Sequence, residues 1–379
     1  MTSISLFFLL LLLSATAAIA TLSSDLTALE AIKAAIDPAT IPETSCLASW
    51  NFTSDPCSSN ALPTHFRCGL SCGFENRITG LYFDGAGYSG TISPFISNLT
   101  GLLAIYLRDN KFHGPIPTAL FSLPNLGTLD VRNNLFSGSI PPVISITKTL
   151  LDIDLSNNSL SGSLPPTLSS LSLGALNLSF NQFSGPIPIL PRNLEILAIQ
   201  SNYFSGHLRN RSFGGLIQLK NVDLSRNSLT GPIPGWFFLQ PRLERVNLSH
   251  NGFTGIEVLK PNKTRLIDVD AGYNKIVGYL SANFMAYPEL TSLSLRDNKL
   301  QGPIPKEFSL KNMMLRNLFL DGNYFNGKPS KDFFSQKSIV SGSFGDNCLK
   351  RCPKSSKLCL EPQKPSSICR NVYGGKGNP

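Results

Sequence analysis

The sequence predicts an α/β solenoid, because one pattern of about 24 residues recurs along most of the chain. Its clearest copy runs from Leu150 to Pro165 and alternates apolar and polar residues before Asn158. Such alternation is typical of a half-buried β-strand, and the glycine and proline that follow it indicate a turn. An asparagine holds the place of Asn158 in ten copies: Asn110, Asn134, Asn158, Asn181, Asn202, Asn227, Asn251, Asn274, Asn298 and Asn323.

A single coil of this length cannot bury its apolar face alone, so stacked coils must share one continuous core. We expect the amide of Asn158 to bond backbone groups where the strand bends, and its equivalents to form a ladder along the solenoid. Eleven such units fit residues 78–330, and the first of them carries Ala86 in place of the asparagine. The residues of the clearest copy predicted to point inward are Leu150, Ile153, Leu155, Leu160 and Leu164.

A second motif, Gly-x-Ile-Pro, follows the strand in several units, at residues 114–117, 138–141, 185–188, 231–234 and 302–305. With this motif the chain resembles the plant-specific leucine-rich repeat, as found in receptor-like protein ectodomains and polygalacturonase-inhibiting proteins. The resemblance implies a right-handed superhelix with a parallel β-sheet on its concave face. We expect the ends of this solenoid to be capped by disulfide-bonded segments, because stacked repeats expose their core at both ends.

The first twenty residues predict export of the chain. An unbroken apolar run, Leu6–Leu13, is followed by the small residues Ala18 and Ala20, as in a secretory signal peptide over residues 1–20. No later run reaches the length of about 18 apolar residues that a membrane span needs. We therefore expect a secreted protein of the apoplast or cell wall without a transmembrane segment.

Eight cysteines lie outside the repeats, in two clusters: Cys46, Cys57, Cys68 and Cys72, and Cys348, Cys352, Cys359 and Cys369. An even number of cysteines in an exported chain favours disulfides over a zinc site, and we expect the pairs to stay within each cluster. The clusters predict an amino-terminal cap over residues 21–77 and a carboxy-terminal cap with a basic tail over residues 331–379. Spacing alone leaves the connectivity within each cluster open.

The amino-terminal cap also resembles that of the plant repeat family. The resemblance implies a disulfide between Cys57 and Cys68, and our hypothesis for the two additional cysteines, Cys46 and Cys72, is that they pair with each other. At the start of the cap, the pair Ser24-Asp25 precedes an apolar pattern of helical period, which predicts a short amphipathic helix capped by these polar side chains.

Positive charge is concentrated at the carboxy-terminal end. From Asn326 onward there are ten Lys and Arg against three Asp and Glu, so this segment carries +7 of the formal net charge of +9. Such an excess supports contact with a polyanion. Export makes nucleic acid an improbable partner and an acidic wall polysaccharide a better one, although the charge could also serve solubility alone.

The sequence offers no catalytic constellation. The four histidines share no spacing, and neither a nucleophile elbow nor a kinase signature is present. We therefore predict a binding protein rather than an enzyme, with no cofactor and no metal. Strand residues that alternate with the inward ones should point outward on the concave face. The predicted binding residues are Tyr106, Arg108, Arg132, Asp268, Asp270, Tyr273, Arg296, Asp297, Phe319 and Asp321.

Two alternatives qualify this face. Tyr273, Arg296 and Phe319 could form an apolar and cationic stripe for a ligand, or the charges around them could simply pair across strands. Carbohydrate could also cover part of the face, because occupied acceptors at residues 157, 177 and 247 would shield the fourth, fifth and eighth units. The predicted N-glycosylation acceptors are Asn51, Asn98, Asn157, Asn177, Asn210, Asn247 and Asn262.

Taken together, these features predict a secreted plant leucine-rich repeat protein that recognises a peptide or protein in extracellular signalling or defence. Its partner could be a receptor kinase ectodomain or a microbial enzyme. Resemblance to the polygalacturonase-inhibiting proteins gives one alternative, inhibition of microbial polygalacturonases. A wall component held in place by the basic tail is another.

Overall fold

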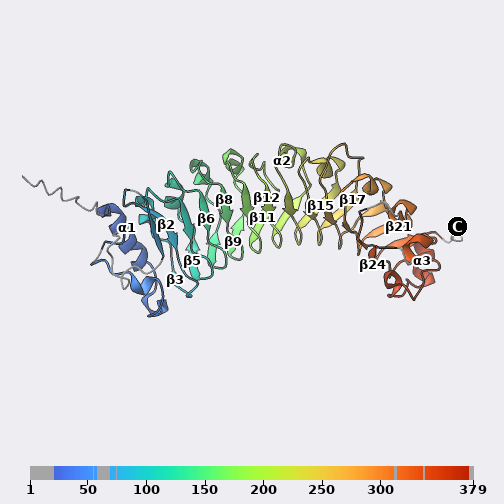
Figure 1. Ribbon diagram of the computed structural model, residues 1–379, viewed down its shortest axis with the longest axis horizontal. Helices are drawn as coiled ribbons and strands as arrows, with labels where there is room; N and C mark the ends of the chain where they lie inside the picture. Colours follow the sequence, from blue (N-terminus) through green and yellow to red (C-terminus); the bar gives the residue numbers. More distant parts are fainter. Residues whose placement is uncertain are drawn as a thin grey trace, which may run out of the picture.

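Coils of the chain stack side by side along one axis, and the first helix, α1 (Ser23–Ala34), and the last, α3 (Ser366–Val372), lie at opposite ends of a long, curved body (Figure 1). The computed structural model describes residues 21–53, 55–57, 69–73, 75–310, 314–335 and 338–374. The predicted signal peptide of residues 1–20 and the predicted disulfide cysteine Cys68 lie outside these residues. The predicted solenoid fold is confirmed.

A sheet of thirteen strands runs the length of the solenoid. Neighbouring strands are parallel, except that β1 lies antiparallel to β2. In the short strands from β4 to β22 the middle residue is buried and the first and third residues face outward; we call this outward surface the concave face. The strands are β1 (Leu70–Cys72), β2 (Ile78–Tyr82), β4 (Ala104–Tyr106), β6 (Thr128–Asp130), β8 (Asp152–Asp154), β10 (Ala175–Asn177), β12 (Ile196–Ala198), β14 (Asn221–Asp223), β16 (Arg245–Asn247), β18 (Asp268–Asp270), β20 (Ser292–Ser294), β22 (Asn317–Phe319) and β24 (Ser341–Ser343).

A second row of strands follows the bend of each coil, and it is interrupted once. Eight strands form one sheet and three form another, with the break between β17 and β19. The Gly-x-Ile-Pro motif is missing at this break, over residues 255–261, which begin in β17 and continue into the segment that follows it. The strands are β3 (Ser89–Gly90), β5 (Lys111–Pro115), β7 (Leu135–Gly138), β9 (Ser159–Gly162), β11 (Gln182–Gly185), β13 (Tyr203–Gly206), β15 (Ser228–Ile233) and β17 (Gly252–Ile256), then β19 (Val277–Tyr279), β21 (Lys299–Pro303) and β23 (Tyr324–Asn326).

Short helices complete most coils. Proline begins several of them, because its fixed φ suits the first helical turn and its missing N–H is not needed there. The 3₁₀ helices are η1 (Pro38–Thr40), η2 (Leu47–Ser49), η3 (Pro94–Asn98), η4 (Thr118–Ser122), η5 (Pro142–Ile146), η6 (Pro166–Ser170), η7 (Gly235–Leu239), η8 (Ala282–Ala286), η9 (Lys306–Ser309), η10 (Lys331–Phe334) and η11 (Lys357–Cys359); the α-helices are α1 (Ser23–Ala34), α2 (Asn210–Phe213) and α3 (Ser366–Val372).

The core and the asparagine ladder are confirmed. Leu150, Leu155 and Leu160 are fully buried. The Asn158 amide nitrogen donates to the carbonyls of Val131, Leu155 and Ser156 at 3.1–3.2 Å, and its oxygen accepts from the Phe136 N–H at 3.0 Å. Each asparagine thus bonds its own coil and the coil before it, which satisfies polar backbone groups that are otherwise buried without partners.

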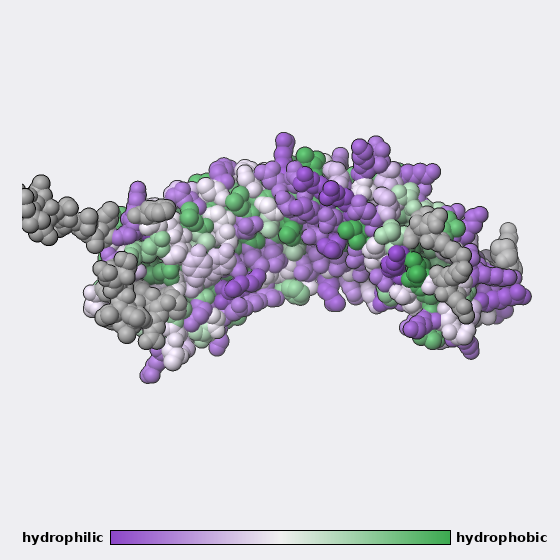
Figure 2. Space-filling model, in the orientation of Figure 1, coloured by the Kyte–Doolittle hydropathy of each residue, from purple (hydrophilic) through white to green (hydrophobic). Residues whose placement is uncertain are grey.

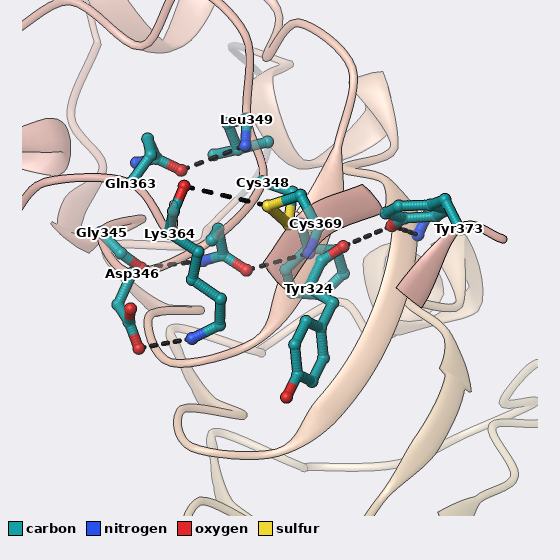
Figure 3. Close-up of a disulfide and its surroundings, with 12 residues drawn as sticks. Tyr324, Gly345, Asp346, Cys348, Leu349, Gln363, Lys364, Cys369 and Tyr373 are labelled. Carbon is teal, nitrogen blue, oxygen red and sulfur yellow. Dashed lines mark hydrogen bonds and ion pairs between the residues drawn. A yellow bond between two sulfur atoms is a disulfide. The ribbon is translucent and has the colours of Figure 1, made fainter. Parts of the chain in front are cut away.

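The ladder extends one coil further than the sequence predicted. Asn347, in the carboxy-terminal cap, is fully buried and bonds the carbonyls of its own and the preceding coil in the same way. Beyond it, the amide of Gln363 takes the place of the next rung, because it accepts from the Leu349 N–H at 3.1 Å and donates to the Phe344 carbonyl at 3.1 Å (Figure 3). Gln363 therefore ends the ladder.

The amino-terminal cap corrects two predictions. Helix α1 is present, but its cap position is Leu22 and no side chain caps it. Asp25 is instead fully buried and accepts from the Arg77 guanidinium and the Ile78 N–H, each at 3.0 Å, so its carboxylate satisfies donors at the start of the first coil.

The predicted Cys57–Cys68 and Cys46–Cys72 disulfides are wrong. Cys57 is bonded to Cys72, with 5.7 Å between their Cα atoms, because the antiparallel strand β1 places Cys72 beside Cys57. Cys46 is also disulfide-bonded.

The carboxy-terminal cap is described to Gly374, and the last five residues of the predicted basic tail, 375–379, lie outside the described residues. Disulfides join Cys348 to Cys369 and Cys352 to Cys359, both within the cluster as predicted. Helix α3 is held against the last coils by the first disulfide and by the Tyr373 hydroxyl, which donates to the Tyr324 carbonyl (Figure 3).

Candidate functional site

Outward residues of the concave face form columns, because equivalent positions of successive strands lie side by side. One column contains the third residue of each short strand and the residues in register with it, and only some of its members hold the strand ends by hydrogen bonds. Its members are Tyr82, Tyr106, Asp130, Asp154, Asn177, Ala198, Asp223, Asn247, Asp270, Ser294, Phe319 and Ser343.

Two pairs in this column support the strand ends. The Asp154 carboxylate accepts from the N–H and hydroxyl of Ser156, at 2.9 and 2.6 Å, and from the Asn177 amide at 3.0 Å. Three repeats further along, the Asp223 carboxylate accepts from the N–H and hydroxyl of Ser225 and from the Asn247 amide in the same way. These two carboxylates therefore have a structural role. The amides of two predicted glycan acceptors, Asn177 and Asn247, are donors in the same hydrogen bonds.

The other predicted acceptors differ in exposure. Asn98 is half-buried, whereas the remaining four are exposed: Asn51, Asn157, Asn210 and Asn262.

An aromatic and basic patch covers the amino-terminal third of the concave face. The rings of Tyr82 and Tyr106 stack with 5.3 Å between their centroids and 15° between their planes. Arg108 beside them is exposed, whereas the Arg132 guanidinium lies 3.5–3.7 Å from the carboxylates of Asp130 and Asp154. Three predicted residues are thus brought together here, and Tyr82 joins them.

A hollow of about 380 Å³ interrupts the middle of the face, over β12, β14, β16 and β18. It forms because Ala198 stands in a column where its neighbours carry larger polar side chains. The exposed Ile196 lines one side, and Asp223, Asp268 and Asp270 line the other, with Arg245 near them. The lining therefore carries three carboxylates and one guanidinium around a small apolar floor.

Two groups in the hollow are not fully satisfied within the chain. The amide oxygen of Asn221 is buried and has no hydrogen-bond partner among the described residues. Burial raises the pKa of Asp268 and the charge of Asp270 adds to this rise, although a hydrogen bond with Ser292 and the charge of Arg245 oppose it. Both groups would be stabilised by a donor placed in the hollow.

The predicted carboxy-terminal stripe forms only in part. The Arg296 guanidinium lies 4.6 Å from the centre of the Phe319 ring and 3.3 Å from the Asp321 carboxylate. Tyr273 instead stacks on His250, with 4.2 Å between ring centroids. The charge of Arg296 is therefore paired across strands, as the alternative interpretation holds, while Phe319 and Tyr273 belong to separate contacts.

The remaining predicted residue, Asp297, is exposed and has a left-handed φ of 49°. This residue precedes the ladder asparagine, and the chain turns there into the core. Sequence reasoning missed Tyr82, Ile196, Asn221 and Arg245. In the sequence, the hollow was indicated only by the small side chain of Ala198, at a position where neighbouring repeats carry larger residues.

Repeats of this kind are found when the chain is compared with known families. The Leucine rich repeat models match residues 192–253 and, as separate repeats, residues 125–145, 149–171, 172–194 and 289–310; the Leucine rich repeat N-terminal domain matches residues 22–59. The chain is a leucine-rich repeat protein.

Relatives of this leucine-rich repeat protein include Receptor-like protein 32 of Arabidopsis thaliana, which is 32% identical over 139 residues, or 34% of this chain and 15% of that protein. The structure described as “Crystal structure of PEPR1-AtPEP1” matches 86% of this chain and 49% of that chain, with a TM-score of 0.71 and 26% identity. “Plant peptide hormone receptor RGFR1 in complex with RGF2” matches 73% of this chain and 49% of that chain, with a TM-score of 0.62 and 26% identity.

This leucine-rich repeat protein thus spans about half the length of these solved chains and a smaller share of its curated relative. Among the residues that the structure describes, no helix is both long and apolar enough to cross a membrane. The same residues contain no group of three or more His, Cys, Asp and Glu side chains that could hold a metal ion.

Proposed function

We propose that this leucine-rich repeat protein is an extracellular recognition protein that binds a peptide, or an extended segment of a partner protein, along its concave face in signalling or defence. The observation that carries the proposal is the hollow over β12 to β18, flanked by the patch of Tyr82, Tyr106 and Arg108 on one side and by Phe319 on the other. A peptide ligand is supported by one structural relative, the plant peptide hormone receptor RGFR1 in complex with RGF2.

The dimensions of the face suit an extended chain. Adjacent strands are about 4.8 Å apart, so the eleven strands from β2 to β22 span roughly 50 Å. An extended peptide covers at most about 3.3–3.6 Å per residue, so roughly fifteen residues would reach from one patch to the other. A small metabolite would occupy only a fraction of that surface.

The hollow favours a basic side chain of such a ligand. Three carboxylates and one guanidinium give its lining a formal charge of −2 (one positive against three negative charges). A Lys or Arg side chain could donate to Asp268, Asp270 and the unpartnered oxygen of Asn221, while its aliphatic part packs on Ile196. A receptor kinase ectodomain is the partner we propose for passing on the signal.

A peptide array tests the proposal. The purified protein is incubated with synthetic dodecamers of varied sequence, and the peptides that bind are measured by calorimetry against wild type and the Asp268→Asn/Asp270→Asn variant. We expect the bound set to be enriched in Lys or Arg and the variant to lose at least about tenfold in affinity, since such contacts are worth about 1.5–3 kcal/mol each. Asp152→Asn, an exposed acid on β8 outside the hollow, is the matched control.

Two results would count against this function. The first is a set of bound peptides whose affinity is unchanged by substitutions anywhere on the concave face. The second is inhibition of fungal polygalacturonases by the purified protein with no peptide bound, which would favour the inhibitor alternative instead.

A further inference from the structure

Four of the nine Lys and Arg residues of the carboxy-terminal cap lie in one short loop. Cys352 and Cys359 close this loop with a disulfide, and their Cα atoms are 5.7 Å apart. We call residues 350–359 the basic loop, because it contains Lys350, Arg351, Lys354 and Lys357 and no acidic residue. All four of these cationic side chains are exposed.

Backbone hydrogen bonds fix the basic loop to the solenoid. The Lys350 N–H donates to the Gly327 carbonyl at 2.8 Å, and the Leu358 carbonyl accepts from the Phe344 N–H at 2.6 Å. Leu358 and Cys359 are each only 3% exposed, so one side of the loop is part of the core of the cap. The first of these bonds also brings the exposed Lys328, the residue after Gly327, next to the start of the loop.

Three cations of the basic loop, Arg351, Lys354 and Lys357, are not in ion pairs with acids among the described residues. The carboxylate of Asp346 is paired with Lys364 at 2.5 Å (Figure 3), and the charge of Glu361 acts on Asp321 of the concave face. Figure 2 shows hydrophilic side chains gathered on this end of the molecule.

From these observations we propose that the basic loop is a binding site for an acidic polysaccharide with a carboxylate on successive sugars. Ammonium and guanidinium groups form charge-assisted hydrogen bonds with carboxylates. Because a disulfide and the core hold the loop in place, little conformational freedom is lost when a polymer lies across its cations. The disulfides place the chain in an oxidising compartment, where an acidic polysaccharide is a more accessible polyanion than nucleic acid.

The site is separate from the concave hollow, and the two are independent. The basic loop belongs to the cap after the last repeat, whereas the hollow lies over β12 to β18. A peptide on the concave face and a polysaccharide on the cap could therefore be bound together. The loop would hold the protein in a matrix while the concave face stays open to a ligand.

Binding of polygalacturonate tests the proposal, with fully methyl-esterified homogalacturonan as the uncharged probe. We expect the protein to bind polygalacturonate only, and raising NaCl from 50 to 200 mM to weaken binding roughly 50-fold, the counterion-release effect for four contacts on a flexible polyanion. The variant with Lys350→Gln, Arg351→Gln, Lys354→Gln and Lys357→Gln should bind at least about fourfold more weakly, since each exposed ionic contact is worth about 0.2–1 kcal/mol.

A second variant of equal net charge is the control. It carries glutamine at four exposed cations of the repeats: Lys148, Arg192, Lys260 and Lys263. Both variants lower the formal net charge from +9 to +5, and thermal unfolding checks that both are folded. Binding within about threefold of wild type in the control, with loss in the loop variant, supports the proposal.

Three outcomes would overturn the proposal. They are equal losses in the two variants, no binding of polygalacturonate by wild type, and binding of phosphatidylserine vesicles in its place. The first would attribute binding to net charge alone, and the last would assign the loop to a membrane surface.

Discussion

Replacing one rung of the asparagine ladder should destabilise the protein far more than its small volume suggests. Asn323 is fully buried; its amide nitrogen donates to the carbonyls of Leu295, Leu320 and Asp321, and its oxygen accepts from the Leu300 N–H at 3.0 Å. An amide has two hydrogens, so the three carbonyl contacts count as two hydrogen bonds, and the accepted bond makes three. At about 1 kcal/mol each, Asn323→Ala should lower the free energy of unfolding by about 3 kcal/mol.

Urea unfolding followed by circular dichroism, with the disulfides intact, measures this change. Asn125→Ala is the control, because Asn125 is exposed and makes a single amide bond, to the Thr100 carbonyl at 3.0 Å. We expect the control to lose no more than about 0.5–1 kcal/mol. Equal losses in the two variants would mean that the buried backbone groups find other partners and that the ladder does not stabilise the coils.

Three further results follow from the structure. Ala198→Leu should fill the hollow and abolish peptide binding while changing the free energy of unfolding by less than about 0.5 kcal/mol, as calorimetry and urea unfolding would reveal. Cys57→Ser and Cys72→Ser should each cost about 2–5 kcal/mol and the double variant no more than either, whereas a Cys57–Cys68 peptide in a non-reducing digest would refute the pairing. Burial raises the pKa of Asp268; the stability linked to this group is therefore present below its ordinary pKa and lost as the pH rises through its folded-state pKa. Asp268→Asn removes that loss, so Tm should rise more between pH 4 and pH 7 in the variant than in wild type.

The repeat geometry could be predicted from the sequence because it depends on local patterns. Leucine spacing fixes which side chains face the core, and the asparagine position fixes where each coil bends. The absence of asparagine at Ala86, in the first repeat, is explained by the same geometry. The amide oxygen of a ladder asparagine serves the coil before it, as Asn110 serves the N–H groups of Gly87 and Tyr88. At the first coil there is no preceding repeat to serve.

Features that depend on contacts between distant segments could not be predicted. The role of Asp25 as partner of Arg77 requires knowing that α1 lies over the end of the first coil. The pairing of Cys57 with Cys72 depends on the antiparallel strand β1, which no repeat pattern indicates. At the candidate site, the outward positions of Tyr106 and Phe319 could be predicted from the alternation of residues along each strand. The hollow could not, because it depends on the size of Ala198 relative to the side chains on adjacent strands.

The direction of the asparagine ladder bears on how the protein is made. Asn134 bonds the Leu107 carbonyl and the Phe112 N–H of the coil before it, so a coil is complete only when the next one has left the ribosome. Structure formed during synthesis should therefore lag one repeat behind the emerging chain. The last rung is supplied by Gln363, sixteen residues beyond Asn347 and between the paired cysteines Cys348 and Cys369. Closing that disulfide in the secretory pathway would lock the final coil after all the others have formed.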